Sequence, residues 1–417
     1  MDDTAVKELR QRFPALARQG PDRRPLVLAD APGGSQAPDT VIDAIGAHLR
    51  RGASNTHGAF ATSRETDQLI ADAHVAAADL LGADPDGIVF GANTTTLLLH
   101  LSRSFARTIG PGDEVVVTRL DHDANIRPWI LAAEDAGATV RWVDVREDDA
   151  TLDPSSFDAV LSDRTALVAF TLASNAVGTI TPAIDLIRRA KVTGAIVAVD
   201  GVHLAQHRSI DLRSLGADLV TSSPYKYFGP HQGVLAARRE LLETWEPYKL
   251  RPADDTNPGR WETGTQNHEA MAGTIAAIDY LASIGTTYGT PADPSRAAAI
   301  EAGFAEIEAH ERVLTTRFLD GLATIDAARL SGIADPARVG ERTPTFAIRL
   351  GDQHPLDTAA ALADRGIHVW DGHYYAIELY DRLGLNDTGG AVRIGFCHYH
   401  TTDEVDRVLD ALADLAR

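Results

Sequence analysis

Residues 195–237 have the sequence AIVAVDGVHLAQHRSIDLRSLGADLVTSSPYKYFGPHQGVLAA, in which three short apolar runs alternate with polar segments. Two of the runs, 195–200 and 217–222, end in polar residues, and the third run spans 233–237. Near-continuous apolar runs of this length are typical of strands that are covered on both faces of a sheet. The segment therefore predicts the interior of a helix-covered, mostly parallel sheet.

The same alternation extends upstream to about residue 39. Helical patterns, such as TDQLIADAHVAAADLLG (66–82) and PAIDLIRRAKVTG (182–194), separate further apolar runs. Strands that alternate with amphipathic helices favour an α/β fold. The four additional predicted strands are GIVF (87–90), EVVVT (114–118), TVRWVDV (139–145) and ALVAFTLAS (166–174).

The downstream third of the chain has a different pattern. Helices are predicted from about Gln266 to Ile284 and from about Ser295 to Ala323, with a Gly/Thr/Pro-rich break between them. Beyond them, TPTFAIRL (343–350), GIHVW (366–370) and AVRIGFCHY (391–399) alternate like half-exposed strands, and a helix is predicted to end the chain. We expect an N-terminal segment (1–38) that packs with the small domain, a large cofactor-binding domain (39–290) and a small α+β domain (291–417).

Composition narrows the classes of partner. The 417 residues include 39 basic and 59 acidic side chains, a net charge of −20 that disfavours nucleic acid and anionic lipid as partners. No apolar run is long enough to span a bilayer, and the N-terminal residues lack a signal-peptide pattern. The single cysteine, Cys397, excludes an intramolecular disulfide. These features predict a cytoplasmic protein.

Polar residues at the predicted strand ends suggest a reaction centre, because ligands of open α/β sheets bind beyond the carboxyl ends of strands. Asp200 ends one strand, and Lys226 lies in the Ser-rich turn after the next strand. Taken singly, they could be a turn former and a surface lysine. Together they suit pyridoxal phosphate, whose aldehyde forms a Schiff base with lysine and whose pyridine nitrogen needs a carboxylate partner. Residues 93–95 begin a helix, which is a favourable place for a phosphate.

Several motifs, taken in order along the whole chain, resemble the class V aminotransferase and cysteine desulfurase-like family of pyridoxal phosphate enzymes. The resemblance implies fold type I: a large domain with a mostly parallel seven-stranded sheet flanked by helices, and a smaller α+β C-terminal domain. It also implies a homodimer with its sites at the interface. The motifs are LDHDANIRPW (120–129), SNAVGTI (174–180), VDGVHLAQH (199–207), TSSPYKYFGPHQGVL (221–235) and WETGTQN (261–267).

The resemblance assigns roles to individual residues. Lys226 is expected to be the Schiff-base lysine and general base, Asp200 the partner of the pyridine nitrogen, and His122 the ring that stacks on the cofactor. Arg393 is expected to bind the substrate carboxylate, since a guanidinium fork suits a carboxylate. The other expected cofactor contacts are Asn93, Thr94, Thr95, Asn175, His203, Ser223 and Tyr225, with Gly264 and Thr265 supplied by the neighbouring subunit; the other expected substrate contacts are His57, Asp371, His373 and Tyr374.

His203 and His207 have a spacing that metal ligands also use. Without a third ligand they predict no metal site. For Asn175 and His203, the alternative interpretation is as turn and core residues.

The chain departs from the desulfurase pattern in two places. Tyr225 precedes the lysine where the desulfurases usually have histidine. More importantly, desulfurases carry a mobile cysteine in the loop before the substrate-binding arginine, and the corresponding loop here, GIHVWDGHYYAIELYDRLG (366–384), has none. The predicted strand RIGFCHYH (393–400) places Cys397 on the same face as Arg393, although we interpret this cysteine as a buried packing residue rather than a persulfide carrier.

These observations predict a pyridoxal phosphate-dependent lyase or transferase that removes the Cα proton of an amino acid. We expect β-elimination from a cysteine-like substrate, a C–S lyase reaction that needs no enzyme thiol. Alternatives are a cysteine desulfurase that uses Cys397 or an external thiol, an amino acid epimerase or aminotransferase, and a non-catalytic cofactor-binding scaffold. The sequence leaves open the natural substrate and whether a sulfur acceptor protein exists.

Overall fold

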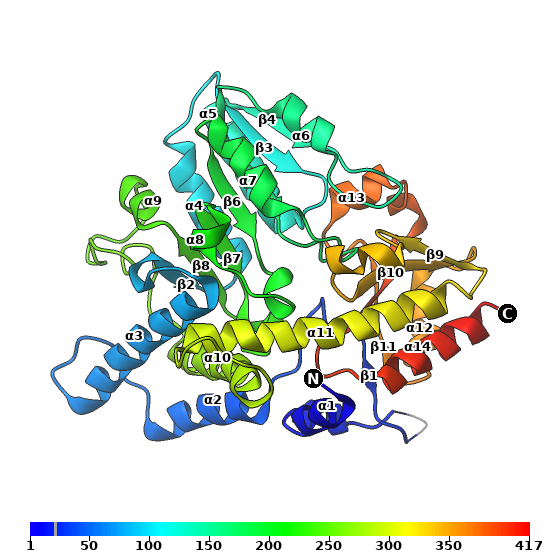
Figure 1. Ribbon diagram of the computed structural model, residues 1–417. Helices are drawn as coiled ribbons and strands as arrows, with labels where there is room; N and C mark the ends of the chain where they lie inside the picture. Colours follow the sequence, from blue (N-terminus) through cyan, green and yellow to red (C-terminus); the bar gives the residue numbers. More distant parts are fainter. Residues whose placement is uncertain (21–22) are drawn as a thin grey trace.

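The computed structural model describes residues 1–20 and 23–417. Its central sheet contains all seven strands predicted for the large domain, in the order β2–β8–β7–β6–β5–β3–β4 (Figure 1). Only β8 runs antiparallel to its neighbours, so the mostly parallel sheet is confirmed. The strand bounds are β2 Ile88–Gly91, β3 Glu114–Thr118, β4 Thr139–Val143, β5 Thr165–Thr171, β6 Ile196–Asp200, β7 Leu219–Ser222 and β8 Gly233–Ala237.

The reversal at β8 has a simple cause. Parallel strands need a crossover of a dozen or more residues, usually a helix. Between β7 and β8 lies only a short connection with one 3₁₀ turn, Pro224–Lys226, so β8 returns beside β7 in the opposite direction. That connection carries Lys226 to the edge of the sheet where the parallel strands end.

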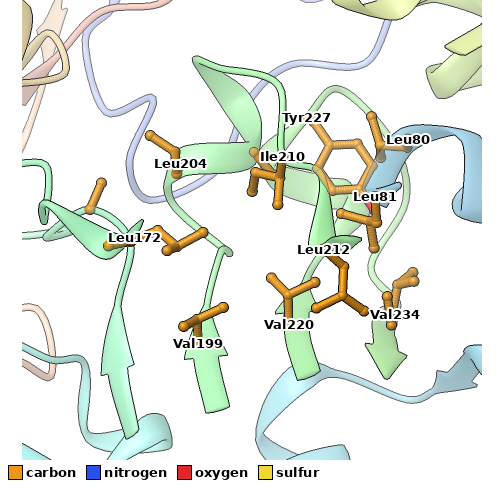
Figure 2. Close-up of a cluster of buried hydrophobic side chains, with 14 of the residues drawn as sticks. Leu80, Leu81, Leu172, Val199, Leu204, Ile210, Leu212, Val220, Tyr227 and Val234 are labelled. Carbon is orange, nitrogen blue, oxygen red and sulfur yellow. The ribbon is translucent and has the colours of Figure 1, made fainter. Parts of the chain in front are cut away.

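Helices cover both faces of this sheet, and alternate residues of each strand point to opposite faces. Val199, Val220 and Val234 belong to one apolar cluster, together with residues of α3 and α8, as Figure 2 shows. Their chain neighbours Ala198, Leu219 and Leu235 belong to a second cluster with residues of α4 and α5. The bounds of these helices are α3 Ala61–Leu81, α4 Thr94–Ala106, α5 Arg127–Ala136 and α8 Leu212–Leu215.

A smaller antiparallel sheet, β12–β13–β10–β9, forms the C-terminal part of the molecule. A two-stranded parallel pair, β1–β11, ties an N-terminal segment to it. Neither β1 nor β9 was predicted, because β1 has two residues and β9 is a four-residue strand whose two apolar side chains are only partly buried. The bounds are β1 Val27–Leu28, β9 Ala328–Ser331, β10 Thr345–Leu350, β11 Ile367–His368, β12 Trp370–Gly372 and β13 Ala391–Gly395.

Two long helices, α10 (His268–Tyr288) and α11 (Arg296–Leu322), pack along each other. The predicted helix end near Ile284 was wrong, because α10 continues through Gly285. A Cβ at Gly285 would lie 1.9 Å from the carbonyl oxygen of Ala299, so this glycine permits a close helix contact rather than ending the helix.

Helix α11 contacts both sheets, and Figure 1 shows it running across the molecule from below the central sheet to below β10 and β9. Phe304 and Ile307 pack in the core of the central sheet, whereas Phe318 and Leu322 pack in the core of the small sheet. The domain boundary at residue 290 therefore stays a prediction.

The remaining helices complete both layers. Among the described residues, none of the helices is long and apolar enough to cross a bilayer. The bounds are α1 Asp3–Arg10, α2 Asp39–Arg51, α6 Pro154–Val160, α7 Ala183–Val192, α9 Arg239–Thr244, α12 Pro355–Ala363, α13 Ile377–Arg382 and α14 Thr402–Leu415.

Candidate active site

A cavity of about 290 Å³ opens at the edge where the parallel strands of the central sheet end. Strands β5 and β6 contribute Thr171 and Asp200, and the loops after β2, β3 and β7 contribute further polar side chains. The small sheet closes the cavity with Arg393. The sequence-predicted residues that line it are Asn93, Thr94, Thr95, His122, Asn175, Asp200, His203, Ser223, Tyr225, Lys226, Tyr374 and Arg393.

Lys226 is buried at the end of the turn between β7 and β8. Its amine contacts the carbonyl oxygen of Pro32 and lies 4.7 Å from the centre of the Tyr225 ring. Burial lowers the pKa of Lys226 to about 7, and the Arg393 charge adds to this effect, while Asp30 and Asp200 oppose it. Near neutral pH a large fraction of this amine is therefore unprotonated, the form that acts as nucleophile and base.

Asp200 ends β6 and is also buried. One of its oxygens, Oδ1, accepts a hydrogen bond of 2.8 Å from the backbone N–H of Val202. Burial raises the pKa of Asp200 to about 6, and the Val202 bond and the Lys226 charge partly offset it. This carboxylate lines the cavity with acceptor capacity left over, which suits a protonated ring nitrogen.

The first turn of α4 forms another wall. Asn93 caps the helix through a 2.9 Å hydrogen bond from Thr96 N–H to its side-chain oxygen, so capping does not occupy Thr94. The Thr94 hydroxyl instead donates to the Ser222 carbonyl and lies 2.8 Å from the Ser223 hydroxyl. Free N–H groups at a helix start and two adjacent hydroxyls form a site for an anion.

Gly233 allows this wall to form. A Cβ at Gly233 would lie 2.4 Å from the carbonyl carbon of Asn93, so β8 can approach the start of α4 only without a side chain there. The close approach fixes the position of the helix N-terminus relative to the turn that carries Lys226.

His122 presents a neutral ring at the cavity. Its Nδ1 accepts a 3.0 Å hydrogen bond from Ala124 N–H, and its ring stacks on Tyr375 with 5.3 Å between centroids. Burial lowers the pKa of His122 to about 4, and the Lys226 and Arg393 charges contribute. The preceding residue, Asp121, is fully buried, which raises its pKa to about 8.

His203 and Asn175 lie on the small-sheet side of the cavity. His203 Nε2 is 3.1 Å from the hydroxyl of Thr343, whereas its buried Nδ1 has no hydrogen-bond partner among the described residues. Burial holds the pKa of His203 well below its usual value. The side-chain amide of Asn175 donates to the Tyr374 carbonyl oxygen at 3.0 Å and thereby braces the aromatic loop.

Arg393 is buried on β13. Its guanidinium donates to Asp30 Oδ1 at 2.8 Å and to the Asn175 carbonyl at 3.1 Å, and it lies 4.4 Å from the centre of the Tyr374 ring. Within the part of the chain that the structure describes, the buried Nε of Arg393 has no hydrogen-bond partner. A charged donor left unpaired beside a cavity points to an anionic ligand.

Some predicted residues lie outside the cavity of their own chain. His57 is exposed and its backbone N–H donates to Asp67, and His373 is exposed as well. Asp371 does not line the cavity either. Gly264 and Thr265 lie in an exposed loop, so their expected role in a neighbouring subunit stays a prediction.

Cys397 lies just beyond the end of β13. The strand ends at Gly395, the Phe396 N–H donates to the Pro344 carbonyl, and the Cys397 carbonyl accepts a hydrogen bond from the His400 N–H. Cys397 is completely buried and does not line the cavity. Burial raises its pKa well above the usual value. Cys397 packs in the same apolar cluster as Ala391, whereas Val392, Ile394 and Phe396 pack in the core of the small sheet, which agrees with the predicted alternation.

Sequence reasoning missed several lining residues, including Asp30, Pro32, Gly33, Trp370 and Tyr375. The first three belong to ADAPGGS (29–35), where an acidic residue and a Pro/Gly turn follow the apolar run VLA. That pattern could have identified this wall of the cavity from the sequence.

The residues present fit pyridoxal phosphate. A buried lysine, a buried acid with a free acceptor site and a helix N-terminus with adjacent hydroxyls face one cavity, beside a flat neutral imidazole. The unpartnered Nδ1 of His203 adds a polar atom that no protein group satisfies. This donor set matches an aldehyde, a pyridine nitrogen, a phosphate and an aromatic ring.

Comparison with known proteins agrees with this geometry. The sequence model of the family described as Aminotransferase class-V matches residues 27–290 and 296–408. A protein named Probable cysteine desulfurase from Streptomyces coelicolor is 32% identical over 430 residues, covering 98% of this chain and 96% of that protein. Probable cysteine desulfurase 2 from Mycobacterium leprae is 33% identical over 423 residues, covering 97% and 95%.

A solved structure is similar over nearly the full length. The apo structure of cysteine desulfurase from Thermococcus onnurineus NA1 superimposes with a TM-score of 0.85 at 26% identity, covering 97% of this chain and 98% of that one. The predicted fold type and family are confirmed.

Proposed function

The chain belongs to the class V aminotransferase family of pyridoxal phosphate-dependent enzymes, and we propose that it cleaves the C–S bond of a cysteine-like amino acid by β-elimination. The proposal rests on the observation that the cavity contains a buried lysine but no thiol. Lys226 and Asp200 both line the cavity, whereas Cys397 is buried elsewhere.

Cofactor binding is assigned to the cavity walls. The first turn of α4, Thr94 and Ser223 would hold the phosphate, Asp200 the pyridine nitrogen, His122 the ring face and Lys226 the aldehyde carbon. Pyridoxal phosphate, when bound, supplies an electron sink for the negative charge that develops at Cα.

The substrate is oriented by its carboxylate. Arg393 offers Nε and a guanidinium edge that now contacts Asp30, and a substrate carboxylate would take over those donors. With the carboxylate fixed, the Cα–H bond can face Lys226, whose amine accepts the proton at Nζ. A pKa near 7 lets this amine accept and release a proton at neutral pH.

Elimination is favoured over desulfuration because the two reactions need different groups. Desulfuration through the enzyme requires a thiol that reaches the substrate sulfur, and Cys397 is fully buried outside the cavity. Elimination breaks the Cβ–S bond with the electron pair leaving on sulfur. The sulfur departs as a thiol, and the rest of the substrate takes up one water and becomes pyruvate and ammonia. Desulfuration to an external thiol remains the second candidate, supported by the names of the relatives.

We also propose a homodimer in which Gly264 and Thr265 complete the phosphate site of the partner and His57 approaches its mouth. The support is that these residues are exposed in the single chain and lie outside its own cavity.

The products decide between the candidates. Holoenzyme is incubated with L-cysteine, and pyruvate, alanine, sulfide and D-cysteine are measured together. We expect pyruvate and sulfide in equal amounts, the same ratio in Cys397→Ser, and no products from Lys226→Ala. Lys7→Ala, an exposed lysine of α1, is the matched control. Alanine as the main product would identify a desulfurase, D-cysteine an epimerase, and cofactor amination without sulfide an aminotransferase.

A further inference from the structure

Two large aromatic side chains, Trp370 and Tyr375, stand exposed at the cavity. They are 58% and 66% solvent-accessible, and both line the cavity wall. The bonds recorded for them in the described part of the chain involve their backbone: the Trp370 carbonyl accepts from the Tyr374 hydroxyl, and the Tyr375 N–H donates to His373. Exposed aromatic groups beside a binding cavity are typical of contacts to a flat apolar ligand group.

The positions of the two aromatics relative to the reacting groups are defined by the sheet. Trp370 lies opposite Arg393 in the antiparallel register of β12 and β13, so the two side chains share one face of the small sheet. Tyr375 stacks on His122, the residue assigned to the cofactor ring. The aromatic pair therefore borders the cavity from the Arg393 side, where the substrate carboxylate would bind, to the His122 side, where the cofactor ring would bind.

Contacts of the loop fix the backbone at Tyr375. Tyr374 and Tyr375 have φ angles of 53° and 61°, a left-handed conformation that non-glycine residues seldom adopt. Hydrogen bonds fix both carbonyls: Asn175 donates to Tyr374 at 3.0 Å and the Asp123 N–H donates to Tyr375 at 2.8 Å. Such backbone persists where surrounding contacts impose it, often at ligand sites.

A substrate whose carboxylate contacts Arg393 and whose Cα faces Lys226 would have its sulfur substituent in the same cavity, whose lining includes the exposed rings of Trp370 and Tyr375. Hydrogen alone, as in cysteine, would leave Trp370 and Tyr375 without a ligand contact. Neither ring carries a charge that could pair with a charged substituent, and the net charge of the chain, −20, disfavours an anionic one.

We propose that the preferred substrates are S-substituted cysteines that carry a flat aromatic, uncharged or cationic group on sulfur; this inference rests on the C–S lyase function proposed above. The Cβ–S bond breaks, the electron pair leaves on sulfur, and the substituent departs as its thiol after protonation. The three-carbon remainder takes up one water and is released as pyruvate and ammonia, so no oxidant or reductant is needed.

The test compares kcat/KM for pyruvate formation by holoenzyme with S-benzyl-L-cysteine, S-carboxymethyl-L-cysteine and L-cysteine. We expect S-benzyl-L-cysteine to be preferred by about 10-fold or more over both, the scale of one good aromatic contact. Trp370→Ala and Tyr375→Ala should each lower the value for S-benzyl-L-cysteine about 10-fold and change that for L-cysteine less than about 3-fold. Trp370→Phe and Tyr375→Phe should retain most of the preference.

Leu356→Ala is the control, because Leu356 is 54% exposed and does not line the cavity. The visible absorbance of bound cofactor verifies that each variant is folded and loaded. Equal turnover of L-cysteine and S-benzyl-L-cysteine, or equal losses for both in the alanine variants, would overturn the aromatic preference while elimination stands. Absence of pyruvate from every substrate would overturn elimination itself and the inference with it.

Discussion

At the scale of single residues, the account depends on how burial tunes Lys226. An exposed lysine with its usual pKa would be unprotonated in about 3 molecules of 10,000 at pH 7. Burial and the Arg393 charge lower the pKa of Lys226 to about 7, so about half of the amines are unprotonated at that pH. The nearby acids Asp30 and Asp200 limit the shift and keep the site balanced in charge.

This tuning predicts the pH dependence of cofactor loading. Attack on the aldehyde needs the unprotonated amine, whose fraction rises as pH increases through the folded-state pKa. When apo protein is mixed with pyridoxal phosphate, the rate of the visible absorbance change should therefore rise up to about pH 7 and level off above it. Stopped-flow measurements across pH 5–10 test this. A rate that still rises steeply between pH 8 and 10 would contradict the lowered pKa, and Lys226→Ala should show no absorbance change.

The residues that could be predicted from sequence are those whose position follows from a strand end. Asp200 and Lys226 lie at one edge of the sheet because the strands before them, β6 and β7, are parallel neighbours. Thr94 reaches the same edge because β2 runs in the same direction, with β8 between it and β7. The Asp30–Arg393 pair joins residues 363 positions apart, so no local pattern could reveal it. For Cys397 the local alternation held, because the cysteine packs in the same apolar cluster as Ala391 whereas Phe396 packs in the core of the small sheet. The alternation could not show that Cys397 lies outside the cavity, because that depends on distant segments.

At the scale of secondary-structure elements, a glycine near the end of a predicted helix can either end the helix or permit a close contact inside it. The sequence alone does not distinguish these two roles. The Gly/Thr-rich segment after Ile284 predicted a helix end, yet α10 continues to Tyr288. Strong apolar strands were all predicted, whereas β1 and β9 depend on pairing with distant segments. Where the local sequence pattern is weak, contacts with distant segments decide whether a strand forms.

The close contact of α10 and α11 gives a stability prediction. Gly285→Ala places a Cβ 1.9 Å from the Ala299 carbonyl oxygen, so the helices must separate. We expect the free energy of unfolding to fall by about 1–3 kcal/mol, the cost typical of overpacking. Chemical denaturation monitored by circular dichroism measures this change.

Gly46→Ala is the matched control, because Gly46 lies inside α2 and its Cβ would meet only the flexible end of Arg50 at 3.1 Å. There the helix propensity of alanine should leave stability unchanged or raise it by up to about 1 kcal/mol. Equal effects of the two substitutions would show that the α10–α11 contact is looser than described.

At the scale of the whole molecule, the proposed dimer explains why Thr265 lies outside its own cavity. If Thr265 donates a hydrogen bond to the partner's phosphate, Thr265→Ala should raise the dissociation constant for pyridoxal phosphate about 10-fold, the loss expected for one charged hydrogen bond. Thr287→Ala, an exposed threonine on α10, should leave it unchanged. Fluorescence titration measures affinity, and light scattering measures mass. A monomer with unimpaired cofactor affinity would contradict the shared site.

The central claim is that Lys226 is the group that bonds the cofactor, and the composition of the chain makes it directly testable. The lysines are Lys7, Lys191, Lys226 and Lys249, and of these only Lys226 lines the cavity, whereas Lys191 pairs with Asp218 and Lys249 with Asp255. Holoenzyme reduced with borohydride, digested and analysed by mass spectrometry should carry one pyridoxyl phosphate group, on the peptide that contains Lys226. A group on another lysine, or none on a yellow protein, would contradict the account.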